Sequence, residues 1–194
     1  PGPRQAELEQ GAAAGSRLFF ELPRASTYEP DLWTTDGSLA STAVVVAGID
    51  SGYGFTPCAG TGDRLLFFDT QENQPALRAL TPDAAAPEEL LAGYGGSTMP
   101  PFLPSGSGLV LAMTDGLYRS DGTSGGTALI ATTSFATWLA PWGHEVLFGG
   151  EALWATQPSS TEPLELTPPT SVTAVNEIVT LGSRIVFVAE SDAA

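Results

Sequence analysis

Residues 15–20 read GSRLFF: a glycine, two polar residues and then an apolar run. A glycine, one or two small or polar residues and then an apolar run return in GDRLLFF, GSGLVLAM, GHEVLFGG and GSRIVFVA, which begin at Gly62, Gly106, Gly143 and Gly182. A glycine just before a short apolar run is typical of a turn that leads into a β-strand, because glycine adopts a positive φ without steric cost. Recurrence with a period of roughly 40 residues predicts a repeat architecture.

Three further segments accompany these copies. Shortly after each of the first four comes a second segment (DLWTTDGS, ALRALTPD, GLYRSDGT, ALWATQPS), and then a third (TAVVVAG, EELLAG, TALIAT, EPLELT). A fourth, poorer one precedes each glycine, with TPCAGTG, PPFLPSG, TWLAPWG and NEIVTLG as the clear copies and QGAAAG as a degenerate one. Most are short, rich in Val, Leu, Ile, Phe, Trp and Thr, and bounded by Gly, Pro, Asp and Ser, which predicts strands joined by turns.

Four short strands in each period predict the blades of a β-propeller, an all-β fold. We expect residues 1–194 to form a single propeller-like segment. Its blades should span residues 5–49, 55–93, 97–133 and 135–167, with a partial blade at 172–190. Both faces of such a blade are apolar, so it must stack on neighbours. Four blades and half of a fifth do not obviously close, which favours part of a larger ring; a four-bladed ring with an extra hairpin is the alternative.

The charge of the chain argues against several kinds of partner. It carries 7 basic and 22 acidic residues, a net charge of −15, so nucleic acid and anionic membrane surfaces would be repelled. No apolar run approaches the roughly 18–20 residues of a membrane span. We therefore expect no nucleic-acid partner and no insertion into a membrane. The first residue is Pro1 rather than Met, so we expect the natural N-terminus to have been removed or to lie upstream.

Two acidic turns resemble ligand sites at first sight. In each, an aspartate precedes a glycine and a hydroxyl residue, as in Asp36-Gly37-Ser38 and Asp121-Gly122-Thr123. An aspartate can accept backbone N–H bonds across a turn while the glycine supplies a positive φ, and this predicts a structural role. Calcium takes about six to eight oxygen ligands, far more than one carboxylate per turn supplies. We expect no cofactor and no metal, and keep calcium as an unsupported alternative.

The same two stretches resemble a known bacterial repeat. DLWTTDGSLAST and GLYRSDGTSGGT are similar to the ELWxxDGT repeat of long secreted or surface-associated proteins, notably of myxobacteria. The matching residues are Leu32, Trp33, Asp36, Gly37 and Thr42 in the first, and Leu117, Asp121, Gly122, Thr123, Gly126 and Thr127 in the second. ALRALTPD and ALWATQPS lack the Asp-Gly pair, so its role is not required in every blade. The resemblance implies a propeller-like, secreted or cell-surface bacterial protein of generally undefined biochemical activity.

Catalytic signals are sparse. His144 is the sole histidine, it stands where a hairpin turn is expected, and no G-x-S-x-G motif accompanies it. Cys58 is the sole cysteine, so an internal disulfide is excluded, and it is expected to be a small buried residue. We therefore assign no catalytic residue. Glycoside hydrolysis needs only two carboxylates, so a carbohydrate-active propeller with carboxylates near its axis stays as an alternative.

Aromatic residues offer the remaining candidates. Trp33, Tyr118 and Trp154 share one repeat position and are expected to fill the space between blades. Tyr53 and Tyr94 lie in the glycine-rich stretches DSGYGF and GYGGST, so we expect them to be exposed and to contribute to a binding surface. The sequence thus favours a non-catalytic extracellular scaffold that binds protein or glycan. A calcium-stabilised adhesion repeat is a further alternative.

Overall fold

The computed structural model describes most of the chain in eleven ranges. They are residues 11–24, 30–48, 56–69, 76–84, 86–92, 100–105, 108–133, 136–157, 160–167, 172–182 and 184–190. Within these ranges the residues form strands, turns and one short 3₁₀ turn, η1 (Leu39–Ser41). In the same ranges, no helix has the length and apolar character that a membrane crossing requires.

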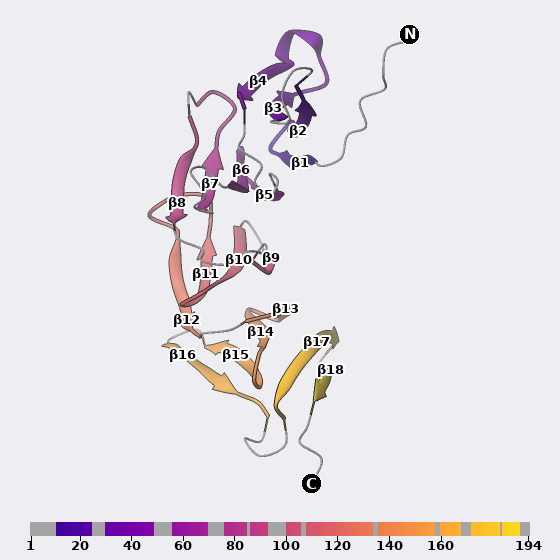
Figure 1. The fold of residues 1–194 in the computed structure, drawn as a ribbon, viewed down its shortest axis with the longest axis vertical. Helices are drawn as coiled ribbons and strands as arrows, with labels where there is room; N and C mark the ends of the chain where they lie inside the picture. Colours follow the sequence, from indigo (N-terminus) through magenta and orange to yellow (C-terminus); the bar gives the residue numbers. More distant parts are fainter. Residues whose placement is uncertain are drawn as a thin grey trace. The chain divides into compact units, whose positions relative to one another are not determined.

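The strands form five antiparallel sheets in the order of the sequence (Figure 1). The first sheet contains β1 (Gly11–Ala14), β2 (Arg17–Pro23), β3 (Pro30–Thr35) and β4 (Ala43–Val46). The second contains β5 (Thr56–Thr61), β6 (Arg64–Asp69), β7 (Ala76–Leu80) and β8 (Glu88–Ala92). The third contains β9 (Phe102–Ser105), β10 (Gly108–Met113), β11 (Gly116–Ser120) and β12 (Ala128–Thr132). The fourth contains β13 (Trp138–Trp142), β14 (Glu145–Gly149), β15 (Leu153–Gln157) and β16 (Ser160–Glu165), and the fifth contains only β17 (Ala174–Leu181) and β18 (Arg184–Glu190).

The recurring glycines make the first hairpin of the sheets. Gly15, Gly62, Gly143 and Gly182 have φ values of 59°, 59°, 63° and 62°. This left-handed conformation suits the tight turns that continue the twist of two antiparallel strands, and a side chain would strain it. Gly106, the remaining copy, lies outside the described residues. The glycine that marks the repeat in the sequence is therefore the turn between the first two strands of a sheet.

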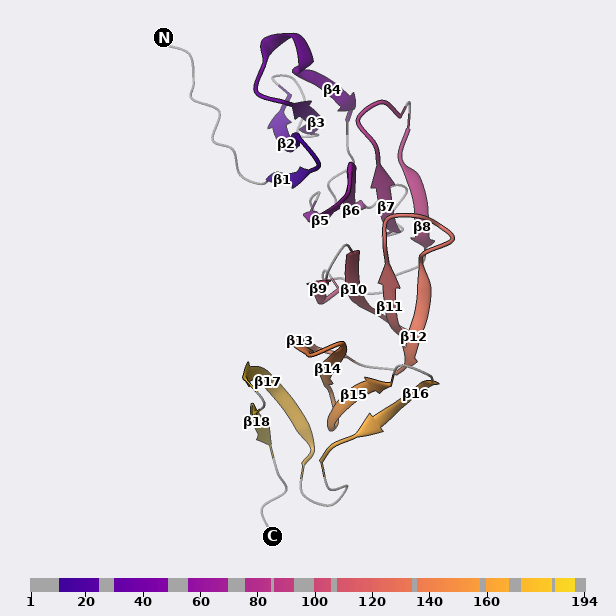
Figure 2. The same cartoon turned by 180° about the vertical axis from the view of Figure 1, so that it is seen from behind.

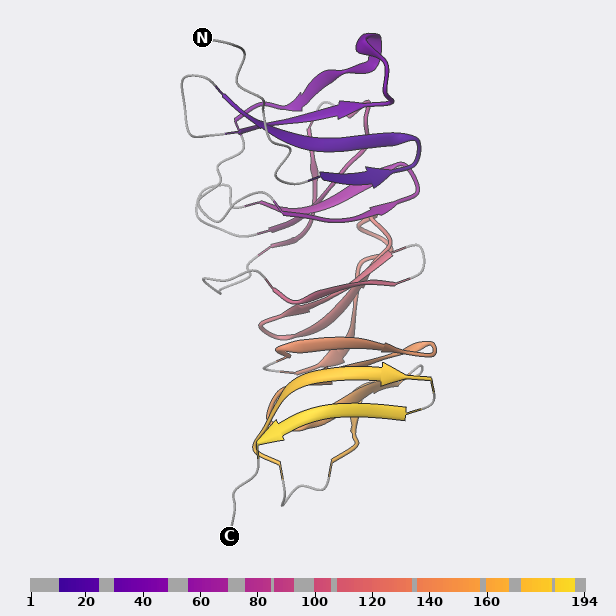
Figure 3. The same ribbon diagram turned by 90° about the vertical axis from the view of Figure 1, so that its right-hand side faces the viewer.

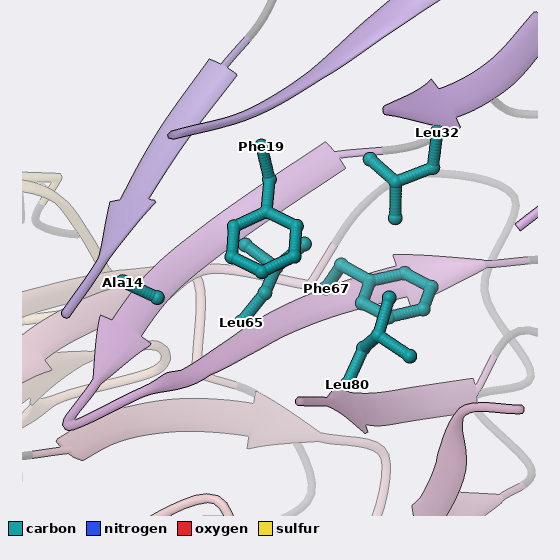
Figure 4. Packing of buried hydrophobic residues seen from close by; sticks show 6 residues of the cluster. All are labelled: Ala14, Phe19, Leu32, Leu65, Phe67 and Leu80. Atoms are coloured by element: carbon teal, nitrogen blue, oxygen red, sulfur yellow. The ribbon is translucent and has the colours of Figure 1, made fainter. Parts of the chain in front are cut away.

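The chain divides into two compact units, the first of which holds residues 1–98 together with 121–124. Its first two sheets share one core (Figure 4). Ala14, Phe19 and Leu32 come from the first sheet, and their partners in the second are Leu65, Phe67 and Leu80. All six side chains are at most 2% exposed. Burial of such apolar faces against each other contributes about 25 cal/mol per Å², which neither sheet could gain alone.

Small residues let the first strands of these two sheets come close together. A Cβ added at Gly60 in β5 would lie 1.9 Å from the carbonyl oxygen of Ala13 in β1. No side chain fits between backbones at that distance. The glycine at position 60 of TPCAGT is thus a requirement of the packing between β1 and β5.

The second unit holds residues 99–120 and 125–194 and repeats the same packing. Phe148 of the fourth sheet is fully buried against Ala112, Leu117 and Ala131 of the third, with Trp154 packed on this cluster. On the opposite face of the fourth sheet, Leu147 and its neighbours bury Val175 and Ile178 of the β17–β18 hairpin. Alternate residues of one strand therefore face different neighbouring sheets, as the period of two in a β-strand requires.

Sheets of four antiparallel strands in sequence order, packed face to face within each unit, define a β-propeller-like, all-β fold. Each sheet lies inside the residue range expected for a blade, and the partial fifth blade is the β17–β18 hairpin. The stretch PDAAAPEELLAG has a helical composition, yet its described residues 88–92 form β8. Pairing with β7 overrides the local propensity there.

Candidate functional site

The turn between β3 and β4 is held together by Asp36. Its Oδ1 accepts a hydrogen bond from the backbone N–H of Ser38 at 2.9 Å and another from the Ser41 hydroxyl. Thr35 Oγ1 and Thr42 Oγ1 lie 2.8 Å apart and close the base of the turn. Gly37 has a φ of 96°, the conformation that this turn requires of a glycine.

The turn between β11 and β12 repeats this arrangement. Asp121 Oδ1 accepts the backbone N–H of Thr123 at 2.9 Å and its hydroxyl at 2.7 Å. Ser120 Oγ and Thr127 Oγ1 lie 2.8 Å apart, as Thr35 and Thr42 do in the first copy. The two aspartates therefore bond within their own turns, which is the arrangement expected of structural residues.

These hydrogen bonds lower the pKa of both carboxyl groups. The Ser41 hydroxyl is the largest cause at Asp36, followed by the backbone and hydroxyl of Ser38, and the pKa falls from 3.8 to about 2. At Asp121 the Thr123 hydroxyl is the largest cause, followed by the Thr123 backbone N–H, and the pKa is again lowered. Both groups are thus held as carboxylates and are poor candidates for a general acid.

The second turn also makes contacts with the second sheet, within the first compact unit. Thr61 Oγ1 donates to the Asp121 carbonyl oxygen at 2.9 Å, and Arg64 Nη1 donates to the Gly122 carbonyl oxygen at 2.9 Å. Arg64 Nη1 also lies 3.1 Å from Glu88 Oε2. The turn is therefore hydrogen-bonded to the hairpin between β5 and β6. We call the two hydrogen bonds, from Thr61 to the Asp121 carbonyl and from Arg64 to the Gly122 carbonyl, the latch.

Sequence reasoning missed the latch, although a signal was available. An arginine stands two residues after the hairpin glycine in three of the five copies, as Arg17, Arg64 and Arg184. A recurring arginine among apolar residues indicates a charged hydrogen-bond donor that serves the repeat. Its acceptor could not be named from the sequence, because Arg64 and Gly122 are 58 residues apart.

The two acidic turns differ in what surrounds them. Gly122 is buried, and a Cβ placed there would lie 2.5 Å from Thr61 Oγ1. Gly37 is exposed, and a Cβ there would meet nothing within 4 Å among the described residues. Leu39, in the same turn, is 95% exposed. The first turn is thus folded like the second but has no described latch partner.

The other candidate residues do not assemble into a reaction centre in the described part of the chain. His144 lies in the exposed two-residue turn between β13 and β14. Tyr53 and Tyr94 fall outside the described residues, and so does the side chain of Cys58, whose backbone is in β5. Among the described residues, no group of three or more His, Cys, Asp or Glu is placed to hold a metal ion.

The β17–β18 hairpin is the yellow pair of strands in Figures 2 and 3. The side chains on one of its faces are apolar and exposed. Val179 pairs with Val186 across it, and Leu181 pairs with Arg184. The exposed fractions are 43% for Val179, 62% for Leu181, 52% for Val186 and 55% for Val188. Val179, Val186 and Val188 thus form a contiguous exposed apolar surface on one face of the hairpin.

The first sheet exposes apolar residues on the face opposite its core. Leu18 and Val44 are each 40% exposed. Leu18 shares a face of β2 with Phe20, which pairs with Trp33 of β3, and Trp33 pairs with Val44 of β4. All of these side chains therefore lie on one face of the sheet. A further aromatic residue, Trp138 at the start of β13, is 46% exposed. Among the described residues, the other exposed large apolar side chains are Leu39, Leu129 and Leu164.

This repeated sheet architecture defines the chain as a β-propeller-like protein, and the comparisons with known proteins go no further than the fold. No protein-family model matches the chain, and no curated protein sequence matches it. The crystal structure of TolB from Acinetobacter baumannii is similar over 94% of this chain and 51% of that chain, at 16% identity and a TM-score of 0.48. A chain of a Nidogen/Laminin complex is similar over 77% of this chain and 58% of that chain, at 11% identity and a TM-score of 0.44. This chain therefore spans a little more than half the length of each.

Proposed function

We propose that this chain is a non-catalytic β-propeller-like scaffold that binds another protein through the exposed apolar face of its β17–β18 hairpin. The observation that carries the proposal is the exposure of Val186 and Val188 at 52% and 55%. The corresponding residues of the second sheet, Leu66 and Phe68, are 0% and 4% exposed. The second sheet thus buries these positions, whereas the described hairpin exposes them as an apolar surface of the kind that partners cover.

The polar groups of the two acidic turns support a scaffold over an enzyme. The carboxylates of Asp36 and Asp121 accept hydrogen bonds within their own turns. The backbone carbonyls of Asp121 and Gly122 accept the two hydrogen bonds of the latch. A catalytic carboxylate pair would instead need a shared approach to a substrate. These two carboxylates therefore give the carbohydrate-active alternative no support.

We place the scaffold outside a bacterial cell, either secreted or displayed on the surface. The support is the resemblance of Asp31–Thr42 and Gly116–Thr127 to the ELWxxDGT repeat. The net charge of −15 is compatible with solubility and disfavours nucleic acid as the partner.

Site-specific photo-crosslinking tests the proposal. A photoreactive phenylalanine analogue replaces Val186, and a matched variant carries it at Thr132, an exposed position of β12. Each protein is exposed to the secreted and surface fractions of the producing bacterium and irradiated. We expect one or a few protein adducts at Val186 and none in common with Thr132. Equal labelling at the two positions would contradict the proposal.

Two further assays separate the alternatives. Turnover of any member of a panel of chromogenic glycosides by the purified chain would contradict the non-catalytic assignment. Glycan binding that is lost in Trp138→Ala and retained in the Val186 variant would transfer the binding role to the exposed indole, because aromatic faces are the usual platform for sugars.

A further inference from the structure

Three aspartates of this chain are followed directly by a glycine: Asp36, Asp115 and Asp121. In an Asp-Gly pair the backbone nitrogen of the glycine can attack Cγ of the aspartate, because glycine has no side chain to hinder the approach. The new N–Cγ bond closes a succinimide ring, and the amide hydrogen leaves with the carboxyl OH as one water molecule. Water then reopens the ring. Opening at the carbonyl next to Cα leaves isoaspartate, which routes the backbone through Cγ and lengthens it by one atom.

Packing covers two of the three pairs. Gly116 is buried in β11, and a Cβ on it would lie 2.4 Å from the Ala131 carbonyl oxygen. Gly122 is also buried, and its carbonyl oxygen accepts the hydrogen bond of Arg64. Gly37 is exposed, and a Cβ on it would meet nothing within 4 Å among the described residues. There is therefore room for a succinimide ring at Gly37, and packing alone does not prevent its formation.

The attacking nitrogen of this exposed pair is held by a hydroxyl group. The Gly37 N–H donates to Thr35 Oγ1 at 3.0 Å, and Thr35 Oγ1 lies 2.8 Å from Thr42 Oγ1. The reaction requires the nitrogen to lose this hydrogen and to approach Cγ in a near-attack arrangement. A hydrogen bond that directs the N–H to Thr35 works against both requirements.

The carboxyl group of the pair is held as well. Asp36 Oδ1 accepts from the Ser38 N–H at 2.9 Å and from the Ser41 hydroxyl, and Ser41 Oγ accepts the Asp36 N–H at 3.0 Å. The Ser41 hydroxyl first, and Ser38 after it, lower the pKa of Asp36 from 3.8 to about 2. Water is expelled from the protonated carboxyl, and a pKa lowered by this much reduces the protonated fraction at neutral pH by more than about tenfold.

We propose that the Asp36-Gly37 pair is a latent isomerisation site, kept unreactive because the hydroxyl groups of Thr35 and Ser41 hold the Gly37 nitrogen and the Asp36 carboxyl in separate hydrogen bonds. Isoaspartate at this position would add one backbone atom to the turn between β3 and β4 and disrupt the bonds that close it. The reaction needs no partner, so it stands apart from the proposed function.

Isoaspartate formation in the folded chain and in a synthetic peptide of residues 31–42 tests the proposal. Both are incubated at neutral pH, and the chain is then digested. Chromatography with mass spectrometry distinguishes the two isomers, which have equal mass and different retention. We expect the peptide to isomerise at Asp36 at least about tenfold faster than the chain, because it lacks the turn that holds the reacting atoms.

Substitutions of the two hydroxyl residues identify the cause. Thr35→Val and Ser41→Ala should each speed the reaction in the chain about fivefold, the factor that one hydrogen bond contributes. The same substitutions in the peptide should change nothing, because the peptide has no turn to lose. Tryptophan fluorescence checks that each variant is folded. The two variants free different reacting atoms, so either one suffices if the other does not fold.

Ser124→Ala is the matched control, since it removes a serine hydroxyl from an exposed position of the counterpart turn. It should leave the rate at Asp36 unchanged. Equal rates in the peptide and the parent chain overturn the proposal, and so does a parental rate in the folded hydroxyl variants. Acceleration by Ser124→Ala as large as that by Ser41→Ala also overturns it.

Discussion

Thr61 donates its hydroxyl hydrogen to the carbonyl oxygen of Asp121 at 2.9 Å, across 60 residues of sequence. Asp121 therefore has two separate roles. Its side chain holds its own turn through Thr123, and its backbone carbonyl receives the second sheet. The hydrogen bonds of this acidic stretch thus serve both its own turn and its packing on the second sheet.

Replacing Thr61 with valine should destabilise the chain by about 1 kcal/mol, because the shape is kept while the Asp121 carbonyl loses its donor at a part-buried contact. Thr61→Ser keeps a hydroxyl and should lose less. Urea unfolding followed by tryptophan fluorescence measures both variants. Equal stability of valine variant and parent would show that the bond contributes nothing.

Replacing each of the two turn glycines with alanine should separate the stability lost to backbone strain from the stability lost by disturbing the latch. Gly37 and Gly122 have similar φ values of 96° and 90°, so each alanine carries a strain of about 1–2 kcal/mol. Only at Gly122 does the new Cβ also meet Thr61 Oγ1, at 2.5 Å. We expect Gly122→Ala to be the more destabilising by at least about 1 kcal/mol in thermal unfolding. Equal destabilisation by the two alanines would show that the contact with Thr61 adds nothing at Gly122.

The Asp36 carboxyl should titrate near pH 2 instead of at its ordinary 3.8. Because the folded pKa is the lower one, the contribution of Asp36 to stability is present above pH 3.8 and is lost as the pH falls toward 2. Carbon-13 NMR of the side-chain carboxyl measures the midpoint. Ser41→Ala removes the largest cause and should raise the pKa of Asp36 toward 3.8, with no change at Asp121. An unchanged midpoint in that variant would assign the shift to another group.

A methyl group at Gly60 should disrupt the first compact unit. Its Cβ would lie 1.9 Å from the Ala13 carbonyl oxygen, so β1 and β5 would have to separate. The expected cost is about 3 kcal/mol or more, at the upper end of overpacking substitutions. Gly125→Ala, where a Cβ meets nothing within 4 Å and φ is not positive, is the matched control. Hydrogen exchange of the β1 and β5 amides would locate the effect.

The strands were predictable because their signals are local. The hairpin glycines, the apolar runs after them and the period of the repeat appear within a few residues of each other, and the structure places the strands accordingly. The stretch around residues 88–92 is the exception, since its helical composition is overridden by pairing with β7. Even there the repeat indicated a strand where single-residue propensity did not.

The candidate site was only partly predictable. The bonds of Asp36 and Asp121 within their turns follow from residue type and spacing, which is why sequence reasoning could foresee them. Arg64 and Thr61 were missed because their acceptors are backbone carbonyls, which every residue has and no sequence pattern marks. Tyr53 and Tyr94 remain predictions for a binding surface, since they lie outside the described residues.

Residue order alone settled the repeat, the strands and the chemistry of the acidic turns, because each depends on neighbours a few positions apart. Tertiary structure decided which faces are covered. Leu18 and Leu65 occupy the same repeat position, yet Leu18 is 40% exposed and Leu65 is 0% exposed. Val186 and Leu66 also share a position, and they are 52% and 0% exposed. Burial depends on which sheet packs against a face, and that contact joins residues far apart in the chain. The same reason separates the latched turn at Asp121 from the open turn at Asp36.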